Sequence, residues 1–199
     1  MSEHSGVMMR NSDVELRPQS PAEQDEMERL GILSLTGDIN GYARPAVHDA
    51  RAPIEQRAVH IPDVLNEAYD YSRPSSFSRA TVMQFGDYRL MLISGTASVD
   101  EHGFTIYEGD FRAQCWRTYG NITNLLAAEN MSWHDIVRTT CYLRDIERDY
   151  KDFNDIRTAF FEWMELIPLP ASTGIQARLC RDDLLVEMEA IAIARVGSR

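Results

Sequence analysis

The sequence predicts an α+β fold in which a mixed β-sheet carries two helices on one face, a two-layer sandwich. Three observations lead to this prediction. After residue 71 the expected elements follow the order β-β-α-β-α-β-β, two segments show helical apolar spacing, and the last segments alternate with the period of a strand. We expect strands at 81–85, 88–94, 136–143, 172–179 and 184–196, and helices at 110–129 and 149–165.

The first two strands are predicted to form a hairpin. Two β-prone segments, 81–85 and 88–94, flank Gly86-Asp87, a dipeptide typical of tight turns. Within the second arm, residues 90–93 are apolar without alternation, so both faces of this strand are expected to be buried.

Each predicted helix presents one apolar face, at spacings of three and four residues. Pro168 and Pro170 end the second helix, and Ser132 with Asp135 resembles a capping box just before the strand 136–143. The apolar faces consist of Phe111, Cys115, Tyr119, Ile122 and Leu126 in the first helix and of Tyr150, Phe153, Ile156, Phe160 and Met164 in the second.

The last two strands predict self-association. One set of alternating side chains is small or apolar and suits packing under the helices: Thr173, Ile175, Ala177 and Leu179, then Val186, Met188, Ala190, Ala192 and Ala194. The opposite face mixes Ile191 and Ile193 with charged residues, including Glu187 and Glu189. A half-apolar face that the chain's own helices leave uncovered predicts a partner subunit.

Residues 1–70 are expected to form an acidic N-terminal extension, and residues 71–199 the α+β domain. The extension holds 13 acidic and 6 basic residues and too few large apolar residues for a core of its own. We expect residues 1–28 to be mobile or extended and residues 31–35 to form a short strand.

Composition excludes several function classes. A net charge of −11 without a Lys/Arg cluster argues against nucleic acid as a partner. The N-terminus has no signal-peptide pattern, no apolar segment is long enough for a membrane span, and the three cysteines are widely spaced, so we expect a cytoplasmic protein. The histidines and cysteines lack metal-ligand spacing and the glycines do not form a phosphate-binding loop, so no metal or other cofactor is expected.

Several short motifs, taken in order, resemble the Rid (YjgF-like, L-PSP) family over roughly residues 75–196. This resemblance implies a Rid/chorismate mutase-like fold and a homotrimer whose clefts between subunits bind small carboxylates. It also implies hydrolysis of reactive enamines or imines. The motifs are Ile93-Ser94-Gly95-Thr96-Ala97, Gly109-Asp110 with Gln114 and Asn121, 135–140 with 142–145, Asp152-Phe153-Asn154, Phe160-Phe161, and 185–192.

The chain departs from the deaminase pattern at three positions. Ser172 stands where the resemblance places the carboxylate-binding arginine, Gly174 replaces a cysteine, and Phe77 replaces a cleft tyrosine. Serine cannot supply the charged fork that anchors a carboxylate. The stretches 94–98 and 77–80 are more similar to the chorismatase catalytic domain, which hydrolyses or rearranges chorismate.

Glu187 is the candidate acid/base, because desolvation can raise a carboxyl pKa towards neutrality. The alternative is a structural ion pair at a subunit interface. Ser94 and Gly95 are expected to bind substrate charge through backbone N–H groups and a hydroxyl, or else to mark a bend that needs glycine. Arg79 is chosen over Arg73 and Arg178 as the replacement arginine, although each of them could be an ordinary surface residue. With Phe77, Ser172 and Gly174, these residues complete the expected substrate-binding set.

Three functions remain open at this point. The first is an enzyme that uses water to transform a small unsaturated carboxylate, with chorismatase-like chemistry as a close variant. The second is a non-catalytic trimer that binds a metabolite or a protein partner. The third is the endoribonuclease activity associated with the family, against which the acidic charge argues.

Overall fold

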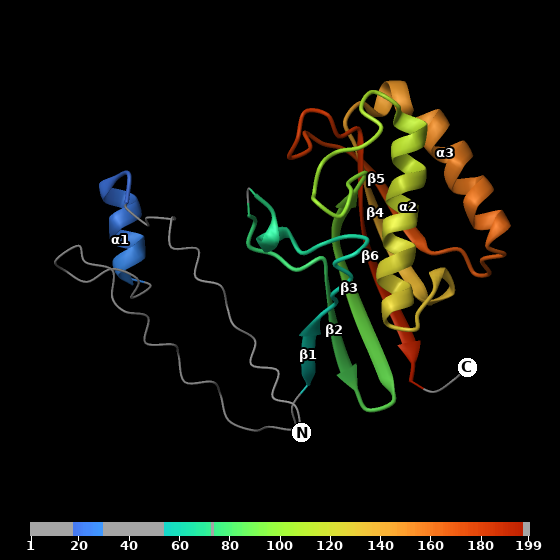
Figure 1. Cartoon of the computed structure of the whole chain (residues 1–199), viewed down its shortest axis with the longest axis horizontal. Helices are drawn as coiled ribbons and strands as arrows, with labels where there is room; N and C mark the ends of the chain where they lie inside the picture. Colours follow the sequence, from blue (N-terminus) through green and yellow to red (C-terminus); the bar gives the residue numbers. More distant parts are fainter. Residues whose placement is uncertain (1–17, 30–53, 73, 197–199) are drawn as a thin grey trace. The chain divides into compact units, whose positions relative to one another are not determined.

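The computed structural model describes residues 18–29, 54–72 and 74–196, and the chain divides into two compact units, Met1–Ala52 and Pro53–Arg199. The second unit therefore begins 18 residues before the boundary expected at 70/71. Figure 1 shows the elements of both units.

The described part of the first unit is helix α1 (Pro21–Arg29), where an extended or mobile segment was expected. Pro21 occupies the first helical position, and the Ser20 hydroxyl accepts a hydrogen bond from the Glu23 N–H (3.2 Å). Both features favour helix initiation. The strand expected at 31–35 lies outside the described residues.

The second unit contains one six-stranded sheet with the order β1-β2-β3-β6-β4-β5. Only β4 and β5 pair in parallel; the other neighbours are antiparallel. The strands are β1 (Glu55–Ala58), β2 (Ala80–Phe85), β3 (Tyr88–Ala97), β4 (Ile136–Leu143), β5 (Ala171–Gln176) and β6 (Val186–Arg195), and the helices are α2 (Phe111–Ala128), α3 (Ile146–Trp163) and the 3-10 turns Ala68–Asp70 and Trp133–Asp135.

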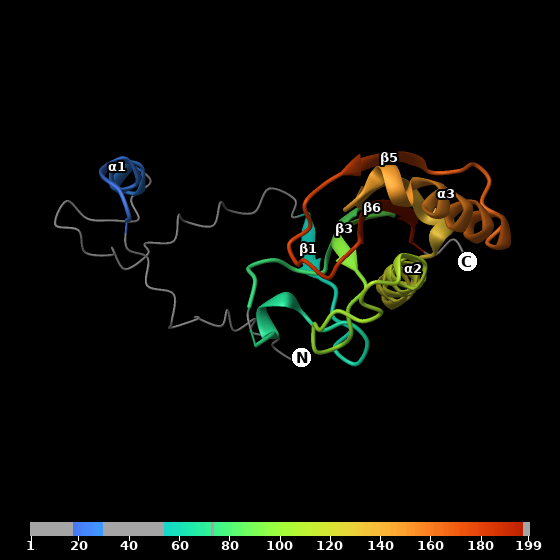
Figure 2. The same cartoon turned by 90° about the horizontal axis from the view of Figure 1, so that it is seen from above.

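Helices α2 and α3 lie together against one face of the sheet (Figure 2), which confirms the predicted two-layer sandwich. Their apolar faces are buried as expected, except that Tyr150 is exposed and Met164 is partly buried. On β6, the side chains of Val186, Met188, Ala190 and Ala192 point into the same core. The capping box of Ser132 and Asp135 is present and begins the 3-10 turn before β4.

The predicted faces of β5 are wrong. Ser172 and Gly174 face α3, because the Ser172 hydroxyl lies 3.3 Å from Arg157 Nη1 and a Cβ on Gly174 would lie 3.7 Å from the Tyr150 ring. Ile175 instead points to the open face, and all six residues of β5 are exposed. Because β5 is an edge strand, little packs over it and alternation alone did not reveal which set faces the helices.

The other sheet face is uncovered in the single chain, as the sequence predicted. Leu92 and Ile193 are 40% and 45% exposed there, so the expected burial of both faces of the strand at 88–94 is wrong for the single chain. A cavity of about 210 Å³ on this face is lined by apolar residues of β3 and β6 together with Arg138, Thr140 and Glu189.

Across the described ranges, no helix has both the length and the apolar character needed for a bilayer span.

Candidate functional site

A cavity of about 310 Å³ opens where the end of β3, the start of β6 and two loops converge. Five of the expected site residues line it: Phe77, Arg79, Ser94, Gly95 and Glu187. The first loop, residues 59–79, leads from β1 to β2, and the second, residues 177–185, joins β5 to β6.

A β-bulge creates the close contact at the centre of this cavity. Ile93 pairs with Ala190 and Thr96 pairs with Met188, so Ser94 and Gly95 together oppose the single residue Glu189. Bulges of this kind re-aim side chains and are frequent beside active sites.

Gly95 leaves room for the carboxylate of Glu187. A Cβ at position 95 would lie 2.0 Å from Oε1 of Glu187 and 3.0 Å from its Cδ. Glycine is therefore required for space rather than for an unusual backbone angle.

Burial raises the pKa of Glu187 above its usual value, and the charge of Glu189 adds to this effect. The charges of Arg79 and Arg181 act in the opposite direction. The Glu187 carboxylate forms no hydrogen bond or ion pair with the described residues, so the alternative of a structural ion pair finds no support within one chain. A half-buried carboxyl group whose pKa is raised suits proton transfer.

Arg79 is buried, with 5% of its surface exposed, so its interpretation as a surface residue is wrong. Its Nε donates to the Asn66 carbonyl (3.1 Å), and its Nη2 donates to the Tyr71 hydroxyl. The backbone N–H of Arg79 donates to Glu67 Oε2 (3.1 Å). These contacts fix the guanidinium, and Nη1 has no hydrogen-bond partner among the described residues.

Two aromatic rings flank this guanidinium. The Arg79 Cζ lies 5.0 Å from the Tyr71 ring centroid and 5.3 Å from that of Phe77. Both distances fall within the range of cation–π attraction. Phe77 therefore contributes to the cavity by presenting the face of its ring to the Arg79 guanidinium.

Ser94 positions the loop instead of presenting donors to a ligand. Its hydroxyl donates to the Ser78 carbonyl (2.7 Å), and its N–H donates to the Arg79 carbonyl (3.0 Å). Both donors already have partners within the chain. Ser94 therefore has no free hydroxyl hydrogen for the donor role to a ligand that was expected of it. Ser94 instead anchors the residues that carry Arg79.

Ser172 and Gly174 do not reach this cavity. Their strand pairs with β4, and Gly174 is paired with Cys141, which is buried on the side of the helices. Tyr142 pairs with Glu187 on the opposite face. Ser172 and Gly174 line a separate cavity of about 800 Å³ between β5 and α3, with Tyr150 and Arg157. Within one chain they cannot act together with Glu187.

Among the lining residues that were not expected from the sequence, the titratable ones are Tyr71, Cys180 and Arg181. They lie in loops without a periodic pattern, so no spacing signal pointed to them. Arg178, considered as a substitute arginine, is exposed and does not line the cavity; Arg73 lies outside the described residues. Cys115 and Cys141 are buried in the core, and burial raises the pKa of both thiols.

Within the described ranges, no group of three or more His, Cys, Asp or Glu side chains is arranged to hold a metal ion. The cavity lining offers one carboxylate and one thiol among its charged and polar groups. What this lining can do is bind an anion and move a proton.

Comparison with known proteins identifies the family. The family model described as endoribonuclease L-PSP matches residues 72–194, more than half of the chain. The chain belongs to the L-PSP family, also called the Rid or YjgF-like family.

Two relatives in this family carry activities in their names. A chorismatase of Streptomyces rapamycinicus is 29% identical over 168 residues, which are 81% of this chain but only 49% of that protein. A 2-iminobutanoate/2-iminopropanoate deaminase of Salmonella typhimurium is 28% identical over 106 residues, 53% of this chain and 80% of the relative. The chain thus spans about half the length of the chorismatase it matches.

The L-PSP fold is also seen in solved structures. The YjgF gene product of E. coli superposes with a TM-score of 0.56 at 22% identity, covering 70% of this chain and 99% of that one. At this identity the similarity establishes the fold alone.

Proposed function

We propose that this L-PSP protein hydrolyses a small unsaturated carboxylic acid whose double bond bears a nitrogen or an ether oxygen, that is, an enamine or an enol ether. The observation that carries the proposal is the single cavity that holds Glu187 and Arg79 together. Arg79 replaces the arginine that Ser172 cannot supply, and it reaches the cavity from the loop before β2.

The residues divide the chemistry between them. The Arg79 guanidinium binds the substrate carboxylate through its unused Nη1. Glu187, whose pKa burial raises, transfers its proton from the protonated form to the terminal carbon of the double bond, and the adjacent carbon becomes an electrophile. Water then adds to that carbon, and Glu187 accepts one of its protons. Glu187 then gives this proton to the nitrogen or ether oxygen and recovers one from the new hydroxyl group as the C–N or C–O bond breaks, which releases ammonia or an alcohol and leaves a 2-oxo acid.

The enamine and the enol ether need the same proton transfer, so one site serves either substrate. A chorismatase-like reaction is the second candidate, favoured by the match that extends over 81% of the chain. In chorismate the reactive group is an enol ether that carries a carboxylate, which fits the same two residues.

Glu187→Gln tests this proposal. The variant is expected to lose about 10²- to 10⁴-fold in kcat, the usual contribution of a general acid, on 2-iminopropanoate, 2-iminobutanoate or chorismate. Glu189→Gln is the matched control, because Glu189 follows on the same sheet face but lines the other cavity of about 210 Å³. Full activity of Glu187→Gln would refute the proposed role.

The wild type decides between enzyme and binding protein. If it consumes no member of this panel while a carboxylate raises its Tm, the non-catalytic binding function holds instead. Cleavage of RNA that survives Glu187→Gln and removal of contaminating nucleases would support the endoribonuclease alternative.

We further propose that the protein acts as a homotrimer with its clefts completed between subunits. The uncovered sheet face with Leu92 and Ile193 supports this, since isolated chains rarely leave such a face in water. Ser172 and Gly174, which face away from Glu187 within one chain, would enter the cleft from a neighbouring copy. Analytical ultracentrifugation at micromolar concentration is expected to give the trimer mass, and a stable monomer would contradict it.

A further inference from the structure

Arg181 places a second guanidinium in the cavity that holds Arg79 and Glu187. The charges of both arginines act on the Glu187 carboxyl and on the Tyr71 hydroxyl. Neither arginine forms an ion pair with a carboxylate among the described residues. The buried Glu67 carboxylate accepts a hydrogen bond from the Arg79 backbone N–H but forms no ion pair with the guanidinium. In a chain of net charge −11, this cavity therefore carries two positive charges against the one carboxyl group of Glu187.

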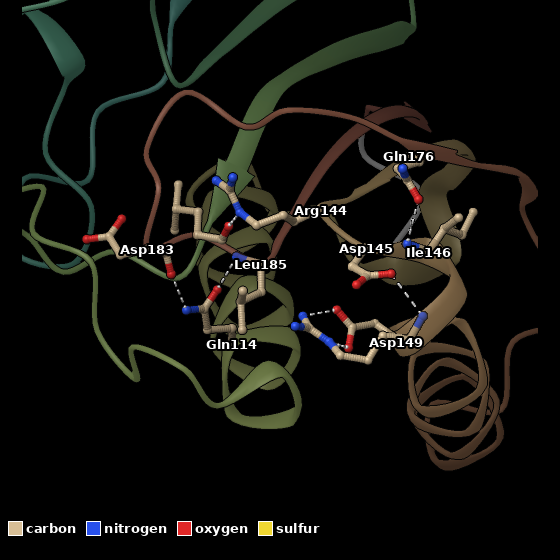
Figure 3. A network of polar contacts seen from close by, with 10 residues as sticks. Gln114, Arg144, Asp145, Ile146, Asp149, Gln176, Asp183 and Leu185 are labelled. Atoms are coloured by element: carbon tan, nitrogen blue, oxygen red, sulfur yellow. Dashed lines mark hydrogen bonds and ion pairs between the residues drawn. The ribbon is translucent and has the colours of Figure 1, made fainter.

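The loop that carries Arg181 is held in place by residues of the core. Arg144 donates from Nε to the Leu184 carbonyl (2.6 Å) and from Nη2 to the Arg181 carbonyl. Gln114, fully buried on α2, donates to the Asp183 carbonyl (2.9 Å) and accepts from the Leu185 N–H (2.8 Å). Figure 3 shows the side chains of Gln114 and Arg144 forming hydrogen bonds to this loop from two sides.

The Arg181 side chain is itself anchored. Its Nη1 donates to the Gly103 carbonyl, and Gly103 packs so closely on Tyr71 that a Cβ there would lie 2.4 Å from the ring. One edge of the guanidinium is thereby fixed, and its remaining donors are available to a ligand. A guanidinium that is already oriented loses less entropy when it binds an anion.

Tyr71 links the two arginines. Its hydroxyl oxygen accepts from Arg79 Nη2, and a guanidinium can only donate, so the hydroxyl hydrogen is left for another acceptor. Burial raises the pKa of Tyr71 and keeps this hydrogen in place at neutral pH. The cavity thus offers two guanidiniums and one hydroxyl donor.

We propose that the substrate carries two acidic groups, one bound by Arg79 and the second by Arg181 with the Tyr71 hydroxyl. This rests on the proposed function for the carboxylate at Arg79 and adds the substrate class, a dicarboxylate or equivalent dianion. Arg181 and Tyr71 are then specificity-determining residues, and Gln114 and Arg144 are positioning residues for the loop.

Two matched pairs of acids test this on the full chain by isothermal titration calorimetry. Fumarate is compared with the monoacid crotonate, and trans,trans-muconate with sorbate, so that each diacid differs from its partner by one carboxylate. We expect at least one diacid to bind about tenfold or more tightly than its monoacid, about 1.4 kcal/mol. Arg181→Met is expected to abolish this preference, because it weakens diacid binding much more than monoacid binding.

Arg178→Met is the matched control, since Arg178 lies three residues away and does not line the cavity. Arg181→Lys keeps the positive charge but loses the paired N–H donors of the guanidinium. It is expected to retain part of the preference for diacids. Tyr71→Phe is expected to weaken diacid binding severalfold. Circular dichroism melting curves establish that each variant is folded.

Equal affinity for diacids and monoacids, or an equal loss of both in Arg181→Met, would overturn the second acidic group. If Arg79→Met then still abolishes monoacid binding, the proposed function stands without it. If the wild type binds none of the four acids, the second site and the carboxylate site of the proposed function are both refuted.

Discussion

Gly95→Ala separates the geometry of the site from the stability of the fold. The added Cβ would lie 2.0 Å from Glu187 Oε1, whereas ordinary contact begins at 3.4 Å, so the carboxylate must retreat by about 1.4 Å. The obstructing atom is the end of a flexible side chain, so a rotation of Glu187 relieves the clash. We expect a loss of about 1 kcal/mol in the free energy of unfolding, the low end for overpacking.

Catalysis should suffer much more than stability. A displacement of about 1 Å at a reacting group typically costs about 10²-fold in rate. We therefore expect kcat on the proposed substrates to fall about 100-fold in Gly95→Ala, with a Tm close to that of the wild type. Steady-state kinetics and urea unfolding measure the two effects on the same preparation.

Gly120→Ala is the matched control. Gly120 lies inside α2, and a Cβ there meets no atom within 4 Å. Alanine in a helix interior should add about 1 kcal/mol of stability and leave kcat unchanged. Wild-type turnover in Gly95→Ala would refute the reasoning, and so would a loss of several kcal/mol, because the backbone rather than the carboxylate would then have moved.

Three further predictions concern titration, packing and thiol access. Because burial raises the pKa of Glu187, the folded chain is favoured while the group is protonated and loses stability as the pH rises above the unfolded value. The Tm of Glu187→Gln should therefore rise relative to that of the wild type as the pH increases above the ordinary carboxyl pKa of 4.5, and a difference that stays constant with pH would contradict this. Phe153→Ala, which empties a fully buried position on α3, should cost about 3–5 kcal/mol in urea unfolding, and a loss below 1 kcal/mol would show that the site is not tightly packed. A thiol reagent should modify Cys180 rapidly in the native protein and reach Cys115 and Cys141 only after denaturation; three fast thiols would contradict the buried core.

Local patterns predicted the elements of the second unit except β1, an edge strand of four residues that no pattern indicated. Strand β4 has the predicted bounds of 136–143, and α2 differs from the prediction by one residue at each end. These elements carry strong periodic patterns and clear end signals, such as Asp110, whose side chain accepts from the Ala113 N–H (3.0 Å). Helix α1 was missed although Ser20, Pro21 and Glu23 carry a start signal, because its face has no apolar period to reveal it.

The candidate site was predicted in part. Gly95 and Glu187 were found by resemblance, and Arg79 was chosen because the family arginine is absent; all three line one cavity. The faces of β5 were assigned wrongly, which separates Ser172 and Gly174 from that cavity. Alternation gives two sets of side chains but does not say which set the core covers, and an edge strand offers too little burial to decide.

The sequence by itself determined the sandwich, its order of elements and the uncovered face of the sheet, because the spacing of apolar residues along a chain is a local property. Only the tertiary structure decided that Tyr71 and Arg181 share a cavity with Arg79 and Glu187. These residues come from loops whose paths depend on long-range hydrogen bonds, such as those from Gln114 and Arg144 to residues about 40 to 70 positions later. Contacts over such separations leave no periodic pattern in the sequence.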